Sequence, residues 1–349
     1  MTTELLSASN PGDILRAADL LRAGDLVAIP TETVYGLAAN ALDPAAVAKI
    51  FAAKGRPQDN PLIVHVPDAA QALPLVKDFP FTARRLAEAF WPGPLTVILP
   101  RASHVPEIVS AGLSTLALRV PAHPAAQALL RACGIPLAAP SANRSGAPSP
   151  TLASHVIDDL GGRVAAILDA GPCTIGVEST VIDLARGKPL LLRPGGIPPE
   201  RLEALLGEID ISQAVTRPLG EDERAASPGL KYKHYAPRAQ LTLVKGPLAA
   251  FLAYAGREKP DGLLCFDEDV PIVHCQHGTC GSFATVNCLS YGPAHDPAEQ
   301  ARRIFTCLRE IDERGWKSVL VRCPAPEGVG LAVYNRLLRA AGFREVEVQ

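Results

Sequence analysis

The sequence lacks the features that mark membrane proteins, secreted proteins and strongly charged proteins. None of its apolar runs reaches the roughly 18 residues that a membrane-spanning helix needs. The first six residues have neither the positive charge nor the apolar stretch of a signal peptide. The formal net charge is only −2, which argues against a general nucleic-acid coat but leaves room for a local basic surface. We therefore expect a cytoplasmic protein that does not contact membranes.

Signals for disulfide, zinc and nucleophilic chemistry are missing as well. The 8 cysteines lie scattered between positions 133 and 323, without a paired C-x-x-C spacing, so we expect reduced thiols and no metal site. The G-x-S-x-G pattern of a nucleophile elbow is absent. So is the phosphate-binding G-x-x-x-x-G-K-[ST] loop, so any bound phosphates would be held mainly by side chains.

The order of apolar segments indicates an α/β protein of two domains, which suits a length of 349 residues. Short apolar runs typical of strands lie at 26–29, 62–66, 95–99, 115–120, 135–139, 165–168, 180–184 and 190–192. Helical patterns lie between them, at 44–54, 81–90 and 125–132. Residues 1–207 are thus predicted to form a large domain with one mixed sheet.

A polar and charged stretch separates this domain from a smaller one. We place a linker at 208–238, which ends in the aromatic and basic motif S-P-G-L-K-Y-K-H-Y-A-P. Residues 239–349 then alternate strand patterns at 241–244, 262–266 and 318–321 with helical ones, which predicts a second α/β domain of ordinary size.

The densest polar cluster is K-G-R-P-Q-D-N-P, at 54–61, between the first helix and the next strand. Lys54 and Arg56 lie on a turn held by Pro57 and Pro61, from which a mobile point charge and a planar donor fork could both reach a phosphate chain. The same two cations could also simply stabilise the negative end of the helix dipole. This segment alone does not separate the two interpretations.

Polar residues also occur at strand ends and within strands. Thr31, Glu32 and Thr33 follow the first strand, where α/β proteins place ligands, although they could equally cap the next element. Strict alternation over 115–120 puts Arg119 on the face of Thr115 and Ala117, where it requires an anionic partner. That partner could be a ligand carboxylate or an internal Asp or Glu. An isolated strand histidine such as His65 is more often a core residue.

The segment P-S-A-N-R-S-G-A-P-S-P, at 140–150, concentrates hydroxyls, an amide and a cation in one rigid loop. Such a loop suits hydrogen bonding to phosphate and sugar, but it could also be only an Asx- or Ser-type turn. Arg193 adds a further cation at the end of the last strand of the large domain.

These motifs together resemble one family closely. PTETVYGLAANA, KGRPQDNPLIVH, STLALRVPAH, APSANRSGAPSPT, GVESTVIDL and LLRPGGI occur in order across residues 30–197, and they resemble YrdC-type threonylcarbamoyl-AMP synthases. The linker motif and the second domain resemble the long, two-domain form of this family. The resemblance implies a twisted mixed sheet with a concave basic face, followed by a Rossmann-like domain.

The resemblance also implies the reaction and its site. The family joins L-threonine, bicarbonate and ATP into threonylcarbamoyl-adenylate and releases pyrophosphate, and a downstream transfer machinery uses the product to modify tRNA. The implied ATP site comprises Lys54, Arg56, Asn60, Thr115, Ser141, Asn143, Ser149, Arg193 and Tyr235, of which Lys54, Arg56, Ser141 and Asn143 are the expected catalytic residues. The implied threonine site comprises Thr33, His65, Arg119, Ala139 and Ser179, and Lys231 and Tyr232 are further candidates in the linker.

The expected chemistry needs no protein nucleophile, because a carbamate oxygen attacks the α-phosphorus, so positioning and charge stabilisation carry catalysis. We expect a magnesium ion held mainly by phosphates and water. One alternative is a YrdC-like module whose basic face binds tRNA or other RNA without catalysis. Another is a carbamoyl-transfer role in metal-cofactor maturation. Many of the 33 prolines border the motifs, where they would stiffen the loops before substrate arrives.

Overall fold

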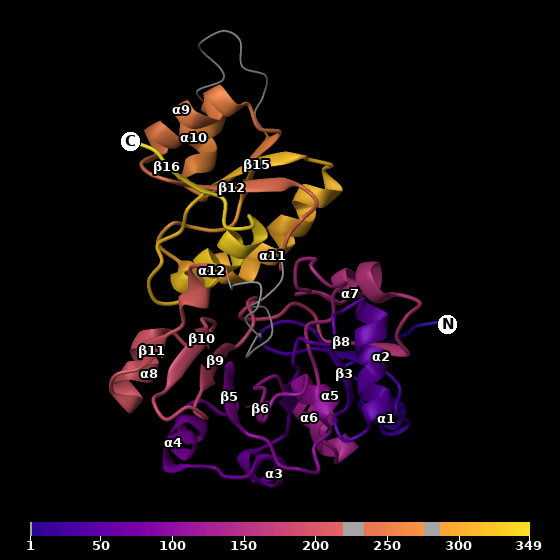
Figure 1. The fold of residues 1–349 in the computed structure, drawn as a ribbon. Coiled ribbons are helices and arrows are strands. Elements are labelled where there is room, and N and C mark those ends of the chain that lie inside the picture. Colours follow the sequence, from indigo (N-terminus) through magenta and orange to yellow (C-terminus); the bar gives the residue numbers. More distant parts are fainter. Residues whose placement is uncertain (1, 219–233, 276–286) are drawn as a thin grey trace. The chain divides into compact units, whose positions relative to one another are not determined.

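The chain folds into two compact units, seen in a computed structural model that describes residues 2–218, 234–275 and 287–349 (Figure 1). The first unit comprises Met1–Ser145 and Ser149–Tyr232, and the second comprises Gly146–Pro148 and Lys233–Gln349. The division therefore falls within the stretch 208–238 that the sequence analysis assigns to a linker. Lys231 and Tyr232 lie outside the described residues.

A large mixed sheet forms the framework of the first unit. Its strands are β1 (Glu4–Ser7), β2 (Val27–Ile29), β3 (Gly36–Asn40), β4 (Ile63–His65), β5 (Leu95–Pro100), β6 (Thr115–Arg119), β7 (Leu137–Ala138), β8 (Ala166–Asp169), β9 (Thr180–Asp183), β10 (Leu190–Arg193) and β11 (Asp210–Ile211). They are ordered β1-β8-β2-β3-β7-β4-β6-β5-β9-β10-β11. The sheet contains parallel pairs such as β4/β6 and antiparallel pairs such as β5/β6, which confirms the predicted mixed α/β class.

Helices and two short 3-10 turns connect these strands. They are α1 (Pro11–Arg22), α2 (Pro44–Lys54), α3 (Ala69–Ala72), η1 (Leu73–Leu75), α4 (Phe81–Phe90), α5 (Glu107–Ser110), α6 (Pro124–Cys133), α7 (Ala153–Leu160), α8 (Pro199–Leu206) and η2 (Gln213–Val215). The predicted helices at 44–54, 81–90 and 125–132 are confirmed as α2, α4 and α6. The sequence analysis did not anticipate β1, β3 or β11, and η2 belongs to this unit although its residues were assigned to the linker.

Local chemistry explains why α2 begins and ends where it does. The Asp43 side chain accepts a hydrogen bond from the backbone N–H of Ala45, which caps the helix, and Pro44 occupies the first helical position. Gly55 ends the helix in the left-handed conformation, with φ of 60°. Lys54, the last residue of α2, is thereby placed at the start of the turn that carries Arg56.

The alternation of β6 separates the face that joins the main core from the face that carries Arg119. Leu116 and Leu118 join the largest buried apolar cluster of the described residues, whereas Ala117 faces a smaller cluster with Ile63 and Ile98. Arg119 shares the side of Ala117, as the period of two predicts. The strand therefore presents its cation away from the main core.

The second unit contains a five-stranded sheet in which every pair is parallel (Figure 1). Its strands are β12 (Gln240–Lys245), β13 (Gly262–Cys265), β14 (Asn287–Ser290), β15 (Ser318–Arg322) and β16 (Glu345–Glu347), in the order β14-β13-β15-β12-β16. Its helices are α9 (Leu248–Glu258), α10 (Asp269–Cys275), α11 (Pro297–Glu313) and α12 (Gly330–Ala340). Parallel strands joined by helices confirm the predicted α/β class of this part.

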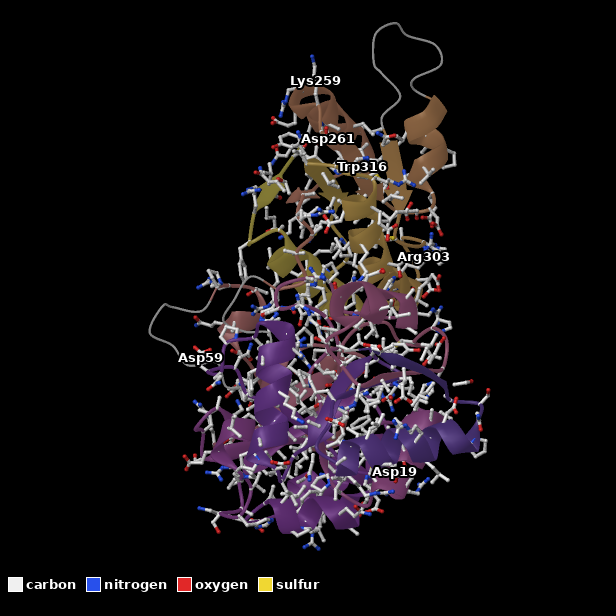
Figure 2. All side chains as sticks on the ribbon, turned by 90° about the vertical axis from the view of Figure 1, so that its right-hand side faces the viewer. Asp19, Asp59, Lys259, Asp261, Arg303 and Trp316 are labelled. Atoms are coloured by element: carbon white, nitrogen blue, oxygen red, sulfur yellow. The ribbon has the colours of Figure 1, made fainter. Side chains whose placement is uncertain are left out.

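Polar side-chain contacts connect neighbouring segments at both ends of this second sheet. At one end, Asp261 accepts hydrogen bonds from the backbone N–H groups of Lys317 and Ser318, at 2.8 and 2.9 Å, beside Trp316 (Figure 2). A side chain at Gly262 would meet the Trp316 ring at 2.2 Å, so this close approach requires glycine.

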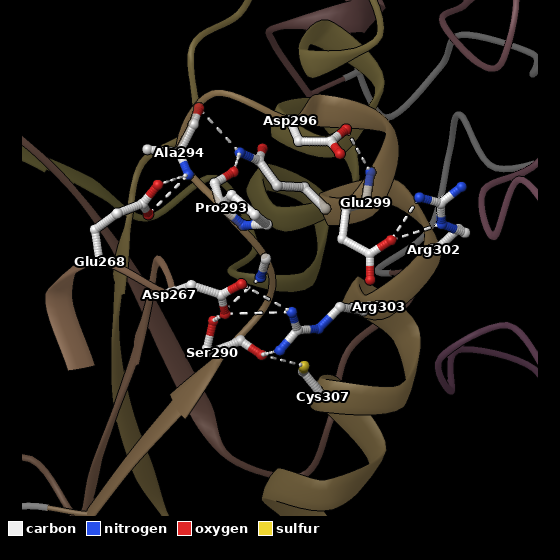
Figure 3. A network of polar contacts seen from close by, with 12 residues as sticks. Asp267, Glu268, Ser290, Pro293, Ala294, Asp296, Glu299, Arg302, Arg303 and Cys307 are labelled. Atoms are coloured by element: carbon white, nitrogen blue, oxygen red, sulfur yellow. Dashed lines mark hydrogen bonds and ion pairs between the residues drawn. The ribbon is translucent and has the colours of Figure 1, made fainter. Parts of the chain in front are cut away.

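At the other end, Arg303 of α11 reaches the residues that follow β13 and those that end β14. Its Nη1 donates to both carboxylate oxygens of Asp267, at 3.2 and 3.1 Å, and its Nη2 donates to the carbonyl oxygen of Ser290 at 3.2 Å (Figure 3). Ser290 also donates its hydroxyl hydrogen to Asp267. These contacts tie α11 to two neighbouring strands.

No helix in the described ranges combines the length and the apolar character needed to cross a bilayer.

Candidate active site

The first group of expected site residues gathers where the end of α2 meets the loop after β7. The ammonium of Lys54 is buried and donates hydrogen bonds to the carbonyl oxygens of Ser141 and Asn143. In return, the backbone N–H of Ser145 donates to the carbonyl oxygen of Lys54 at 2.9 Å. Burial, and then the nearby charge of Arg56, holds the pKa of Lys54 well below its usual value. An anion beside this lysine would offset both effects.

Arg56 lies inside the turn that follows α2. Its Nη2 donates to the carbonyl oxygen of Pro61 at 3.0 Å and to that of Asn60 at 3.3 Å, so the turn wraps around the guanidinium. The side chain of Asn60 is buried, and within the described residues its Oδ1 has no hydrogen-bond partner. This oxygen is an unfilled acceptor on the residue whose backbone carbonyl binds Arg56.

The loop 140–151 is held in shape by its own side chains. The hydroxyl of Ser141 donates to Oδ1 of Asn143 at 2.6 Å, and Nδ2 of Asn143 donates to the carbonyl oxygen of Arg144 at 2.7 Å. The backbone N–H of Ala142 donates to the carbonyl oxygen of Tyr35 at 2.8 Å. Ser149, fully buried, donates to the carboxylate of Glu178. The loop is thus a fixed frame that also joins the segment before β3.

The second group gathers around Arg119 at the end of β6. Its three donor nitrogens are each engaged: Nε with the carbonyl oxygen of Gly93 at 3.2 Å, Nη1 with Oγ1 of Thr33 at 2.9 Å and Nη2 with Oε1 of Glu32 at 2.7 Å. The side chains of Arg119 and Glu32 are 4% and 8% exposed. Of the two anionic partners that the sequence left open, the structure contains the internal carboxylate, and one N–H remains on each terminal nitrogen of Arg119.

His65 lies beside Arg119 because the two residues are register partners in the parallel pair β4/β6. Its Nδ1 is 3.2 Å from the carbonyl oxygen of Ile63, and a carbonyl can only accept, so Nδ1 carries the hydrogen. Burial, reinforced by the charge of Arg119, lowers the pKa of His65 to about 3. The ring is therefore neutral near pH 7 and presents the lone pair of Nε2.

Ser179 and Arg193 are in direct contact. Nη2 of Arg193 donates to Oγ of Ser179 at 3.2 Å, and its Nε donates to the carbonyl oxygen of Ser179 at 3.1 Å. Oγ of Ser179 also lies 2.8 Å from Oγ1 of Thr96. A side chain at Gly195 would come within 2.3 Å of the Thr180 nitrogen, so glycine permits this close packing of two segments. The expected ATP and threonine residues thus share one hydrogen-bond network here.

Thr115, Ala139 and Tyr235 complete the expected set. Thr115 begins β6, four positions before Arg119 and on the same face. The backbone N–H of Ala139 donates to the carbonyl oxygen of Ile63 at 2.9 Å, which joins the loop 140–151 to β4.

Tyr235 belongs to the second unit, where it is 4% exposed and has a left-handed backbone, with φ of 64°. Its ring lies 5.3 Å from the ring of Phe305, and the guanidinium of Arg336 lies 5.3 Å from its centre. The tyrosine is held by aromatic and cation–π contacts within that unit.

The sequence analysis left Glu32, Thr96 and Glu178 out of the expected site, although each bonds a member of it. The sequence contained a signal for Glu32. This residue stands in the same P-T-E-T motif as Thr33, and Arg119, a strand arginine, required an acidic partner. Thr96 and Glu178 had no such signal. Among the described residues, no group of three or more His, Cys, Asp or Glu side chains could hold a metal ion.

Comparison with known proteins assigns this arrangement to a family. Residues 19–195 match the family model described as "Telomere recombination", and residues 197–342 match "Threonylcarbamoyl-AMP synthase, C-terminal domain". The chain is 46% identical over 334 residues to threonylcarbamoyl-AMP synthase of Pyrococcus abyssi, covering 95% of each chain. It is 44% identical over 352 residues to the Bacillus subtilis enzyme, covering 99% of this chain and 97% of the relative.

A solved structure agrees with this assignment. The crystal structure of Pyrococcus abyssi Sua5 complexed with L-threonine superposes with a TM-score of 0.89 at 42% identity, covering 100% of both chains. Two family models in sequence order and a full-length structural match agree on the family. The chain belongs to the threonylcarbamoyl-AMP synthase family, in its two-domain form.

Proposed function

We propose that this protein joins L-threonine, bicarbonate and ATP into L-threonylcarbamoyl-adenylate and releases pyrophosphate and water. The product would then serve a downstream transferase that forms threonylcarbamoyladenosine in tRNA. Full-length identity to threonylcarbamoyl-AMP synthases supports the activity. The single structural observation that carries it is the buried ammonium of Lys54, which is enclosed by neutral carbonyl oxygens beside a second cation, Arg56.

Lys54 and Arg56 are assigned to the phosphates of ATP. Lys54 and Arg56 are both buried, and charges shielded from water interact more strongly with an anion than solvated charges do. Such a pair neutralises the leaving pyrophosphate, and the open Oδ1 of Asn60 supplies an acceptor nearby. The rigid loop that carries Ser141 and Asn143 would position the nucleotide without an ordering cost at the moment of binding. Thr115, Ser149, Arg193 and Tyr235 are proposed to complete the nucleotide site.

Arg119 is assigned to the carboxylate of L-threonine. Its two remaining N–H groups can donate to that carboxylate, and Thr33, His65, Ser179 and the backbone of Ala139 would surround the other polar groups. Because His65 stays neutral, it can accept a hydrogen bond but takes up no proton near pH 7. Catalysis then rests on bringing the carbamate oxygen in line with the α-phosphorus.

A magnesium ion carried by the ATP phosphates would add charge neutralisation there. The roles given to Lys54 and Arg56 do not depend on it. The six free cysteines among the described residues fit a reducing compartment, and we assign the reaction to the cytoplasm.

The deciding assay measures pyrophosphate release by the full chain with ATP, L-threonine and bicarbonate, and with each of the three omitted in turn. Release that requires all three, together with an adenylate of the expected mass, supports the proposal. Tight RNA binding without such release would favour the non-catalytic RNA-binding alternative.

A further inference from the structure

Among the described residues, one oxygen of a buried carboxylate in the first unit has no hydrogen-bond partner. Oε1 of Glu32 accepts from Nη2 of Arg119 at 2.7 Å, whereas Oε2 is shielded from solvent and forms no hydrogen bond within the described residues. The residue as a whole is 6% exposed. A carboxylate oxygen deprived of both water and a donor is costly, so its position points to a missing donor.

The neighbouring hydroxyls cannot supply that donor. Thr31 donates its hydroxyl hydrogen to the carbonyl oxygen of Val34 at 2.6 Å. Its oxygen lies 2.8 Å from the hydroxyl of Thr33, which therefore donates to it. Oγ1 of Thr33 in turn accepts from Nη1 of Arg119. This chain of hydrogen bonds ends on a backbone carbonyl and leaves no hydrogen for Glu32.

The backbone around Glu32 holds the carboxylate in place. Ile175 donates its N–H to the carbonyl oxygen of Glu32 at 2.7 Å, and Gly176 donates to that of Thr33 at 3.1 Å. Burial raises the pKa of Glu32, but the charge and the hydrogen bond of Arg119, together with smaller effects of the backbone N–H groups of Glu32 and Ala122, outweigh it, so the pKa lies below its usual value. Glu32 is therefore charged near pH 7, and a charged carboxylate can only accept hydrogen bonds.

We propose that Glu32 contacts the substrate, with Oε2 accepting a hydrogen bond from the α-nitrogen of L-threonine. This inference rests on the proposed function, in which Arg119 binds the α-carboxylate. In L-threonine the α-nitrogen and the carboxylate are attached to the same carbon. In the protein, Oε2 of Glu32 and the guanidinium of Arg119 are neighbours in the ion pair. A zwitterion then meets a matched pair of opposite charges.

The chemistry of the reaction fits an acceptor at this place. The α-nitrogen carries hydrogens as an ammonium or amine, and it keeps one N–H in the carbamate and in the adenylate. Oε2 can therefore accept a hydrogen bond from this nitrogen in the bound substrate, in the carbamate and in the product. Glu32 needs to take no proton, which agrees with its lowered pKa.

The test is calorimetric binding to the full chain, with two ligands and two forms of the protein. The ligands are L-threonine and 3-hydroxybutanoate of the same β-configuration, which keeps the carboxylate and the hydroxyl but lacks the α-nitrogen. Glu32→Gln keeps an oxygen for Arg119 and replaces the Oε2 acceptor with an NH₂ donor. Glu4→Gln, which alters an exposed ion pair with Arg16, is the matched control.

We expect Glu32→Gln to weaken L-threonine about 10- to 100-fold, the worth of a hydrogen bond to a charged group, and to change 3-hydroxybutanoate less than about 3-fold. If Glu32 only positions Arg119, both ligands weaken by the same factor, and the proposal is overturned. It is overturned too if neither changes. Should Glu32→Gln fail to fold, Glu32→Asp keeps the charge and withdraws the acceptor by one methylene, and the same two-ligand comparison applies. Failure of the unaltered protein to bind L-threonine would instead contradict the proposed function.

Discussion

Replacing Arg119 by methionine tests the buried ion pair of the first unit directly. The variant removes the 2.7 Å partner of Glu32 and leaves a carboxylate that is 8% exposed without a counter-charge. Breaking such a pair costs about 3–5 kcal/mol of the free energy of unfolding. For a unit of this size, that loss lowers the midpoint of thermal unfolding by about 6–20 °C.

The stability lost in Arg119→Met depends on pH through the charge of Glu32. In the unaltered protein the pKa of Glu32 is lowered, so its contribution to stability is present near pH 7 and is lost as the pH falls through the folded-state pKa. Arg119→Met removes the two largest causes that lower the pKa, so burial is opposed only by the backbone N–H groups of Glu32 and Ala122, and the folded-state pKa moves up. That penalty is largest at high pH and shrinks as the pH falls and Glu32 takes up a proton. Thermal unfolding at pH 5 and pH 8 measures the difference.

Two further variants make the result decisive. Adding Glu32→Met to Arg119→Met removes both charges, and most of the lost stability should return, because a buried pair can be exchanged for apolar side chains at little cost. Arg16→Met, in the exposed pair with Glu4, should change the midpoint little. A small loss in Arg119→Met, or a double variant no more stable than the single one, would refute the reasoning.

Two other outcomes follow from the site. Arg56→Ala should lower kcat/KM for ATP about ten- to a hundredfold, which is the worth of a charge-assisted hydrogen bond to phosphate. The exposed control Arg84→Ala should leave kcat/KM unchanged. Unchanged ATP turnover by Arg56→Ala would contradict the phosphate assignment. The imidazole of His65 should show no titration between pH 5 and 8 by NMR, because its pKa is about 3. A transition near pH 6.5 assigned to His65 would show that the ring is more solvated than the structure has it.

Features encoded by neighbouring residues were predictable. Asp43, Pro44 and Gly55 define α2 through capping rules that need no distant partner, and the structure places the helix as predicted. The two-residue period of β6 correctly put Arg119 opposite the main core. The family resemblance named the motifs that the structure brings together around Lys54 and Arg119, and their roles in binding stay predictions.

Other features could not be predicted from local pattern. The strand expected at 135–139 is only Leu137–Ala138, the two residues in register with β3 and β4, although single backbone hydrogen bonds continue at Pro136 and Ala139. β11 has two exposed residues and exists as a strand only through its pairing with β10. Hydrophobic periodicity predicts neither the short length of β7 nor the existence of β11.

The amino-acid sequence by itself determined the α/β class, the ends of the capped helices, the face of each alternating strand and the family. These depend on backbone conformation and on side-chain spacing over a few residues. Only the tertiary structure decided that the partner of Arg119 is Glu32, 87 residues away, and that the Oε2 oxygen of Glu32 has no hydrogen-bond partner among the described residues. A partner at that distance along the chain is selected by sheet register and burial, which arise only when the whole sheet has formed.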